Sequence, residues 1–452
     1  MTLPDRFHVA EGSIRARLAR TPSRARRRAR VRTSVTTRAM ESASALALAL
    51  AQGDPREVLR AFGVRASGGG DAENDVGTSD EAAQERLASA LRTCEKFSPG
   101  YAARAARRAI GAIVEEGGAR ACVCDALAER VTSGDEAVAR GSGIAPESEG
   151  WKNRVYLYAP TRSERAGAIA RRESSAVYAL GETADAIFAR TQSDALAGST
   201  GAFAWPAGFV ACEFALSRLG DALIRGRRVV ELGSGTGVTA TALSRAEPSA
   251  LTLTDRDEAT LENLAANVRL NAAIDRGVST DAIDALSDVS FDNLNDPVTL
   301  GARSIRALDW ERAETSAMAA LDAEFVLAAD CSYDPTLIPG LVRALRALLK
   351  APNSSDTATT LRTLGSRDAE SYLVDACASV PSALVLSAVR QEETMQVLID
   401  SLERAGLHPV DVTSAVDALR DDDSAPKFLF REASRMFAHD AFRAFACTAA
   451  SA

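Results

Sequence analysis

The chain has 452 residues, of which 46% are hydrophobic and 25% charged, a composition typical of soluble proteins with a buried core and not of disordered chains. Domains usually hold about 100 to 200 residues, so we expect two of them. No run of about 18 strongly apolar residues is present, which argues against a membrane span. The seven scattered cysteines, without a CxxC pair, favour reduced thiols; the C-x-C pair at Cys122 and Cys124 is more typical of packing than of a metal site.

The charge is divided unevenly along the chain. Residues 1–40 hold 11 arginines and two acids, whereas the remainder holds 42 basic and 59 acidic residues, a net charge of −17. An arginine-rich leader is typical of an organellar transit peptide, an RNA-contacting arm or a disordered extension. The acidic remainder disfavours a nucleic acid substrate, because phosphate binding needs clustered basic residues. We therefore expect a basic protein as partner. We also expect a monomer in the cytoplasm, with an organellar location as the alternative.

The first half of the chain is predicted to form a helical region and a small β region. Residues 41–150 read as helices, with apolar positions such as Ala83, Leu87 and Leu91 at three- and four-residue spacing. The Gly/Asp/Ser-rich segment 68–81 inside this region is expected to be mobile. A second weakly patterned segment, 133–150, is expected to be a linker. Residues 151–204 are then predicted to form short strands that make a cover or a hairpin.

From Trp205 to the end, apolar strands alternate with amphipathic helices, which predicts one α/β domain over residues 205–452 with a mainly parallel sheet. Segments 275–301 and 352–371 exceed the usual connection length and are expected to be surface insertions. Seven strands are predicted, at residues 228–232, 250–254, 304–308, 325–329, 383–389, 409–412 and 442–447.

The segment RVVELGSGTGVTATAL, which begins at Arg228, is the strongest indication of a ligand site. An apolar strand runs into Gly233, Gly235 and Gly237, and a helix follows at once, so backbone N–H groups of the turn are open to a ligand. The glycine spacing fits neither the dinucleotide fingerprint nor the P-loop. Glu231 at the strand end would repel a pyrophosphate and attract a cationic amino group, such as that of S-adenosylmethionine.

Acids also stand at the ends of the next two strands. Asp255 lies 18 residues after Gly237, at the usual place for an acid that accepts from both ribose hydroxyls. Asp257 competes for this role, but an acid at a helix start is ordinary charge placement. At the third strand end, Asp309 is expected to accept from an adenine amino group and Trp310 either to cover the ring or to pack in the core.

The fourth strand ends in AADCSYDP, which contains Asp330 and, three residues on, Tyr333. In an open α/β sheet, ligands bind beyond the carboxyl ends of the strands, so these acids are expected to surround one crevice. Trp205 precedes the first strand, and Pro206 opens the helix after it, so its side chain can reach the same crevice.

Together these motifs resemble those of the seven-β-strand protein-lysine methyltransferases, in which a W-P-A segment, the ELGSGTG loop, the strand-two acid, LDW and D-x-x-Y recur in this order. Within that group, the segments KFSPGYAARAARRAI, GSTGAFAW, LAADCSYDP and AVRQEETMQVLIDSLERAGL look like those of the eukaryotic elongation factor 2 lysine methyltransferases. The resemblance implies a class I methyltransferase fold, S-adenosylmethionine as cofactor, and a lysine of elongation factor 2 as acceptor. It also implies cofactor contacts from Trp205, Gly233, Ser234, Gly235, Asp255, Trp310 and Ala329.

The same resemblance puts Asp330 and Tyr333 on the edge that faces the lysine. Methyl transfer from a sulfonium requires an aligned, uncharged amine. Asp330 would orient that amine and Tyr333 would pack on the lysine stem. Asp330 either orients the amine alone or also takes its proton; a nearby carboxylate raises the pKa of a lysine. Two alternatives remain: methyl transfer to another protein, a histidine or a small molecule, and a non-catalytic cofactor-binding scaffold.

Overall fold

The computed structural model describes residues 58, 81–95, 98–117, 123–139, 151–159, 185–192, 199–275, 298–300, 302–349, 368–422, 425–428 and 441–449. The leader 1–40 and nearly all of segment 68–81 lie outside these ranges. No helix within them is both long and apolar enough to cross a membrane.

Three helices follow in the N-terminal part of these ranges: α3 (Glu81–Glu95), α4 (Pro99–Gly117) and α5 (Asp125–Ala139). They pack on one another through apolar positions such as Leu87, Leu91 and Leu127, all fully buried. A polar contact fixes α3 against α5, because Arg130 forms an ion pair of 2.9 Å with Glu95. Helix α5 continues to Ala139, into the segment that was expected to be a linker.

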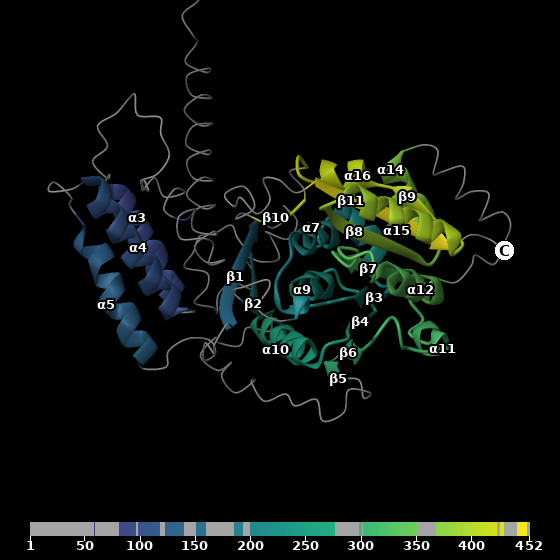
Figure 1. Ribbon diagram of the computed structural model, residues 1–452, viewed down its shortest axis with the longest axis horizontal. Coiled ribbons are helices and arrows are strands. Elements are labelled where there is room, and N and C mark those ends of the chain that lie inside the picture. Colours follow the sequence, from purple (N-terminus) through teal and green to yellow (C-terminus); the bar gives the residue numbers. More distant parts are fainter. Residues whose placement is uncertain are drawn as a thin grey trace, which may run out of the picture. The chain divides into compact units, whose positions relative to one another are not determined.

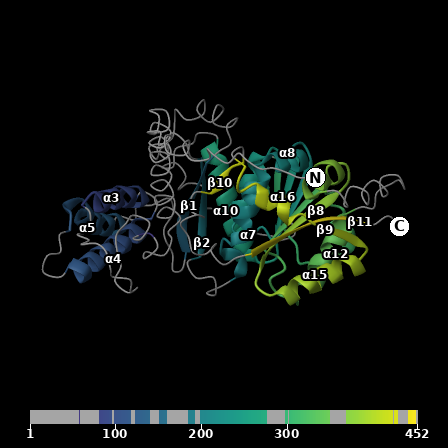
Figure 2. The same ribbon diagram turned by 90° about the horizontal axis from the view of Figure 1, so that it is seen from above.

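A small sheet has the strand order β10-β1-β2, in which β1 (Trp151–Ala159) pairs antiparallel with β2 (Asp185–Gln192) and with β10 (Lys427–Phe428) (Figure 2). Its strand β2 is attached to helix α10 (Glu258–Asp275) by side chains of that helix. The amide of Asn271 accepts from the backbone N–H of Phe188 at 3.0 Å and donates to its carbonyl at 2.7 Å. The pairing with residues near the carboxyl end of the chain was not predicted.

The main sheet has eight strands in the order β5-β6-β4-β3-β7-β8-β11-β9. Neighbours from β6 to β8 are parallel, whereas β11 runs antiparallel to β8 and β9, and β5 runs antiparallel to β6. The predicted seven-stranded, mainly parallel sheet is therefore confirmed, with the short β5 added at one edge. The strands are β3 (Arg228–Leu232), β4 (Ala250–Asp255), β5 (Val298–Leu300), β6 (Arg303–Ala307), β7 (Phe325–Ala329), β8 (Ser382–Val389), β9 (Leu407–Asp411) and β11 (Ala441–Ala449).

Both faces of the sheet are covered, so its central strands are apolar on both sides. Along β3, Val229 belongs to one core, with α7 (Pro206–Ala215), α8 (Arg218–Ile224), α9 (Val238–Arg245) and α10, whereas Val230 belongs to another, with α11 (Thr315–Ala319), α12 (Ile338–Leu348) and α15 (Glu392–Arg404). Figure 1 shows α7, α9 and α10 on one side of the sheet and α11, α12 and α15 on the other. The remaining helical segments are η4 (Thr200–Ala202), α14 (Ala369–Ser371), the π-helix Tyr372–Cys377 and α16 (Thr413–Ala418).

The strand order reverses between β3 and β7. After β3 the chain moves to β4 and β6 on one side, and then returns to β7 and β8 on the other. Such a reversal opens a crevice beyond the carboxyl ends of the strands, because the connections there leave in opposite directions. The fold therefore places the predicted site residues at one edge of the sheet.

Candidate functional site

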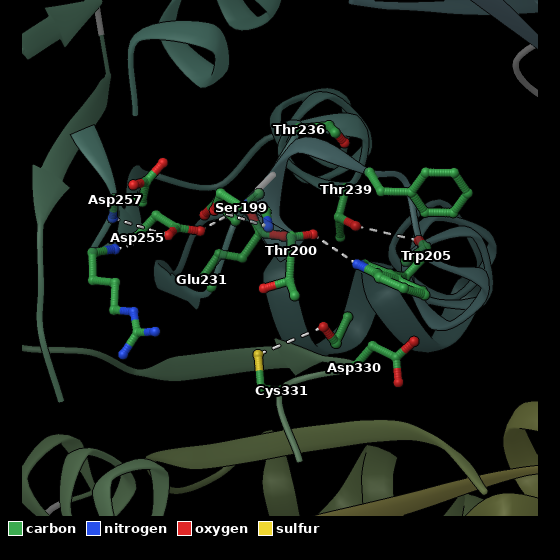
Figure 3. Close-up of a pocket in the computed structure, with 18 of the residues that line it drawn as sticks. Ser199, Thr200, Trp205, Glu231, Thr236, Thr239, Asp255, Asp257, Asp330 and Cys331 are labelled. Carbon is green, nitrogen blue, oxygen red and sulfur yellow. Dashed lines mark hydrogen bonds between the residues drawn. The ribbon is translucent and has the colours of Figure 1, made fainter. Parts of the chain in front are cut away.

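A cavity of about 480 Å³ lies at this edge of the sheet. Figure 3 shows Asp255 and Asp257 at one side of it, Trp205 and Asp330 at the other, and Glu231 between them. Eleven of the twelve predicted site residues line the cavity; they are Trp205, Glu231, Gly233, Ser234, Gly235, Asp255, Asp309, Trp310, Ala329, Asp330 and Tyr333. Gly237 does not.

The glycine turn between β3 and α9 has a backbone that favours glycine. Gly233, Gly235 and Gly237 have φ angles of +64°, +52° and +78°, in the left-handed region that side chains disfavour. A Cβ on Gly235 would lie 3.1 Å from the carbonyl oxygen of Gly201, and one on Gly237 would lie 2.7 Å from Leu264 Cδ1. Gly237 caps α9 and makes room for α10, whereas the other two glycines line the cavity. A contact of Gly237 with the cofactor stays a prediction.

Glu231 is a buried carboxylate at the centre of the cavity wall, 2% exposed. Its Oε2 atom has no hydrogen-bond partner among the residues that the structure describes. Burial raises the pKa of Glu231 to about 8, and the charge of Asp255 adds to this effect, while a hydrogen bond from Ser234 opposes it. A buried acid with a free oxygen that opens on a cavity is suited to a cationic ligand group.

Asp255 stands at the end of β4 and joins the glycine turn to α10. Its Oδ2 accepts from the N–H of Gly235 at 3.0 Å, and its Oδ1 accepts from the N–H of Arg256 at 2.8 Å. Asp257 has a different task, because its Oδ2 accepts from the N–H and the hydroxyl of Thr260 in the first turn of α10. Asp257 is thus a helix cap, which favours Asp255 as the acid for a ribose.

Asp309 and Trp310 follow β6 and line the cavity. Trp310 lines the cavity and also packs on the core beneath α12. Its role in covering the adenine ring stays a prediction. Its ring lies so close to Gly233 that a Cβ there would be 3.6 Å from Cζ2. The Nε1 atom of Trp310 is buried without a partner. Asp309 Oδ1 accepts from the N–H of Glu311 at 2.9 Å and so also shapes the turn.

The segment 199–205 closes the cavity on the side away from the sheet. The indole N–H of Trp205 donates to the carbonyl of Thr200 at 2.8 Å (Figure 3). The Thr200 hydroxyl lies 3.2 Å from the hydroxyl of Tyr333. The first bond lies within the segment, and the second links the segment to the turn after β7. We did not single out Thr200 from the sequence.

Asp330 has an unusual backbone at the end of β7. Its φ angle is +55°, a conformation that costs a residue other than glycine about 1 to 3 kcal/mol and that is often found at functional sites. The carboxylate is 3% exposed. Its Oδ1 accepts from the N–H of Ala388 at 3.3 Å, and its Oδ2 lies 3.4 Å from a guanidinium nitrogen of Arg390. The turn aims the acid at β8, where Arg390 follows the strand end.

Arg390 was not predicted to be a site residue. It follows the fifth parallel strand, just as Asp330 follows the fourth, so the rule that indicated the acids also indicates this position. Its guanidinium carbon lies 5.0 Å from the centre of the Trp205 ring and 5.8 Å from that of Tyr333. The structure thus adds a cation to the site that the sequence analysis described by its acids alone.

Comparison with known proteins bears on the same residues. Residues 189–300 match the lysine methyltransferase family model. The protein-lysine N-methyltransferase EEF2KMT of Homo sapiens is 30% identical over 211 residues, which are 46% of this chain and 52% of that protein. The enzyme of the same name from Mus musculus is 27% identical over 214 residues, 47% of this chain and 51% of that one. The matches thus span about half the length of these curated relatives.

Among solved structures, an arsenic (III) S-adenosylmethionine methyltransferase from Chlamydomonas reinhardtii matches 54% of this chain and 73% of its own, with 13% identity and a TM-score of 0.23. That score is too low to support an argument. The family match contains the glycine turn, Glu231 and Asp255, and both relatives are named protein-lysine N-methyltransferases. Residues 189–300 therefore match a lysine methyltransferase family, and over about half of its length the chain is similar to protein-lysine methyltransferases.

Proposed function

We propose that this chain is an S-adenosylmethionine-dependent protein-lysine N-methyltransferase and that elongation factor 2 is its substrate. The observation that carries the chemical part is the pairing, in one cavity, of a buried carboxylate with a free oxygen and an acidic, aromatic end formed by Asp330, Tyr333 and Trp205. The proposed substrate is supported by the name of the relatives and by the acidic composition of residues 41–452, which suits a basic protein surface.

The residues of the cavity fit the cofactor group by group. Glu231 would hold the ammonium group, since its Oε2 atom needs a partner. Asp255 would accept from the ribose hydroxyls, and Asp309 with Trp310 would take the adenine. Gly233 and Gly235 leave space that any Cβ would narrow. When bound, S-adenosylmethionine supplies an electrophilic methyl group on a positively charged sulfur.

The acceptor end has its own tasks in this proposal. Tyr333 and Trp205 form aromatic walls, which attract a cationic or alkyl side chain and exclude water. Asp330 is held by the N–H of Ala388 and orients the amine as a hydrogen-bond acceptor. A lysine enters mostly protonated near neutral pH, so these groups must bring it to the uncharged form before its electron pair can attack.

Cofactor binding is expected to release close to one proton per site at pH 7. The raised pKa of Glu231, about 8, leaves most of this acid protonated in the free protein, and an adjacent ammonium group favours the ionised form, so the proton leaves. Affinity should therefore rise from pH 6 toward pH 8. Calorimetry in two buffers of different ionisation enthalpy measures the release, and Glu231→Gln should abolish it. Equal enthalpies in both buffers for the native chain would contradict the role of Glu231.

The substrate proposal is tested by incubating the full chain with labelled S-adenosylmethionine and purified eukaryotic elongation factor 2, beside a lysate from which that factor has been removed. We expect the label on the factor and little in the depleted lysate. Label on other lysate proteins, with none on the factor, would show that the substrate is another protein. The proposed methyl transfer would then still stand.

A further inference from the structure

A cation of the protein itself lies beside the acceptor end of the cavity, in contact with residues that line it. Nη2 of Arg390 lies 3.4 Å from Asp330 Oδ2, and the Arg390 side chain is 42% exposed whereas that of Asp330 is 3% exposed. The guanidinium carbon lies 5.0 Å from the Trp205 ring centre and 5.8 Å from the Tyr333 ring centre, within the range of about 6 Å for cation–π contacts. All three groups assigned to the acceptor lysine therefore contact Arg390.

The backbone keeps this arrangement in place. Asp330 donates its own N–H to the carbonyl of Leu386 at 2.7 Å and accepts from the N–H of Ala388, so the acid is tied to β8 twice. Arg390 leaves that strand two residues after Ala388. The ion pair thus joins two adjacent strand ends and does not depend on two long, freely moving side chains.

Other charges near Arg390 come from two elements. From the turn between β7 and α12, Asp334 lines a second hollow of about 400 Å³, which Arg390 and Tyr333 also line. Hydrogen bonds from Thr336 lower the pKa of Asp334, so it is ionised at neutral pH. From the first turn of α15, Glu392 and Glu393 are exposed. The exposed charges nearby are acidic, and the Arg390 guanidinium is a positive charge in contact with Asp330.

This charge matters because the proposed reaction needs an uncharged amine. The nitrogen forms its bond to the methyl carbon with the electron pair that its proton occupied, so that proton must first leave to solvent. An unpaired carboxylate beside the amine holds the proton, whereas a neighbouring cation expels it. A unit charge about 5 Å away, at an effective dielectric constant of about 20, changes a pKa by about 2 units. Because the Arg390 side chain is partly exposed, solvent and salt screen its charge, and we expect a change in the pKa of the amine of about one unit.

We propose that Arg390 is a positioning residue that neutralises the Asp330 carboxylate, so that the acceptor lysine meets an aligned but electrically balanced site and reacts as the free amine. An arginine serves this purpose because it stays protonated at any pH that the enzyme meets. The inference rests on the proposed lysine methyltransferase function, and it separates two properties of Asp330: the acid orients the amine, and Arg390 prevents it from retaining the proton.

The test is the pH profile of kcat. The full chain and the variants Arg390→Gln and Arg390→Lys are given saturating labelled S-adenosylmethionine and whole-lysate protein, and methyl-lysine is measured from pH 6 to pH 10. For Arg390→Gln we expect the apparent pKa of kcat to rise by about one unit. Its rate should thus be about tenfold lower than that of the native chain at pH 7 and should approach the native rate near pH 10. Arg390→Lys keeps the charge and should keep the native profile.

Two controls keep the result interpretable. Calorimetric binding of S-adenosylmethionine and the circular dichroism spectrum show whether each variant is folded, and Glu393→Gln removes a nearby exposed charge that contacts neither Asp330 nor the rings in any interaction described above. We expect Glu393→Gln to keep the native profile.

The outcomes are distinct. If Arg390→Gln lowers kcat by the same factor at every pH, Arg390 has only a structural role and the inference is contradicted. If Arg390→Gln raises kcat at every pH, Arg390 occupies the place of the acceptor lysine, and the inference is contradicted as well. If the native chain itself forms no methyl-lysine, the proposed function fails and this inference fails with it; a native chain that is active while Arg390→Gln has the same profile refutes the inference alone.

Discussion

Replacing Asp255 by alanine is expected to weaken S-adenosylmethionine binding by about tenfold to a hundredfold. The change removes a charge-assisted hydrogen bond, worth about 1.5 to 3 kcal/mol. It also removes the acceptor for the N–H of Gly235, at 3.0 Å, so the glycine turn loses a support. Burial raises the pKa of Asp255, and hydrogen bonds from three backbone N–H groups oppose this effect. Methylation should recover in part at high cofactor concentration.

Asp257→Ala is the matched control, because it removes the neighbouring acid without removing the Gly235 contact. Because Asp257 caps a helix, this variant should lower the free energy of unfolding by about 0.5 to 2 kcal/mol. Its affinity for the cofactor should stay within about threefold of the native value. Calorimetry and thermal unfolding measure the two quantities. A large loss of affinity for Asp257→Ala with none for Asp255→Ala would exchange the roles of the two acids.

Replacing Tyr333 by alanine is expected to lower kcat/KM for the protein substrate at least tenfold while cofactor affinity stays within about threefold. Tyr333 lines both the main cavity and the second hollow, so its ring is a wall between the two. Its removal takes away positioning that is needed in the transition state, and saturating cofactor cannot restore it.

Tyr333→Phe separates the ring from the hydroxyl, which lies 3.2 Å from that of Thr200. Phenylalanine keeps the aromatic wall, so we expect kcat/KM within about threefold of the native value. Steady-state rates with the protein substrate measure both variants. Native rates for Tyr333→Ala would mean that the D-x-x-Y segment has a structural role and that the lysine enters elsewhere.

The parts of the fold that could be predicted are those in which a local sequence pattern is compatible with only one kind of structure. Strand β3 is an apolar run followed by glycines, and its residues face cores on both sides, so the sequence pattern and the burial agree. The acids at successive strand ends could be placed together because parallel strands end at one edge of a sheet. These two regularities were sufficient for the sheet and for eleven residues of the cavity wall.

The features that were missed depend on contacts distant in sequence. Strands β5 and β10 are very short, and β10 owes its pairing to β1, more than 260 residues away. Gly237 shares its positive φ with the two glycines before it, but the side chain that excludes a Cβ there belongs to α10. Nothing in the local pattern distinguishes a glycine that faces a ligand from one that faces a helix.

Arg390 was missed for a different reason. The expected cofactor and the lysine are both cationic, so acids were expected around them, and an arginine at the fifth strand end did not fit that expectation. Only the structure shows that its guanidinium pairs with Asp330 and lies over two aromatic rings. A search for any charged residue at the carboxyl ends of the parallel strands would have found it.

The most direct measurement is the fate of the methyl group. The full chain is incubated with S-adenosylmethionine labelled in the methyl group and with whole-lysate protein, and the labelled product is hydrolysed to amino acids. The account predicts label in Nε-methylated lysine, greatly reduced for Asp255→Ala at low cofactor concentration. Label in methylhistidine or in a small molecule, or binding of S-adenosylmethionine without any transfer, would contradict the assignment of this cavity to lysine methylation.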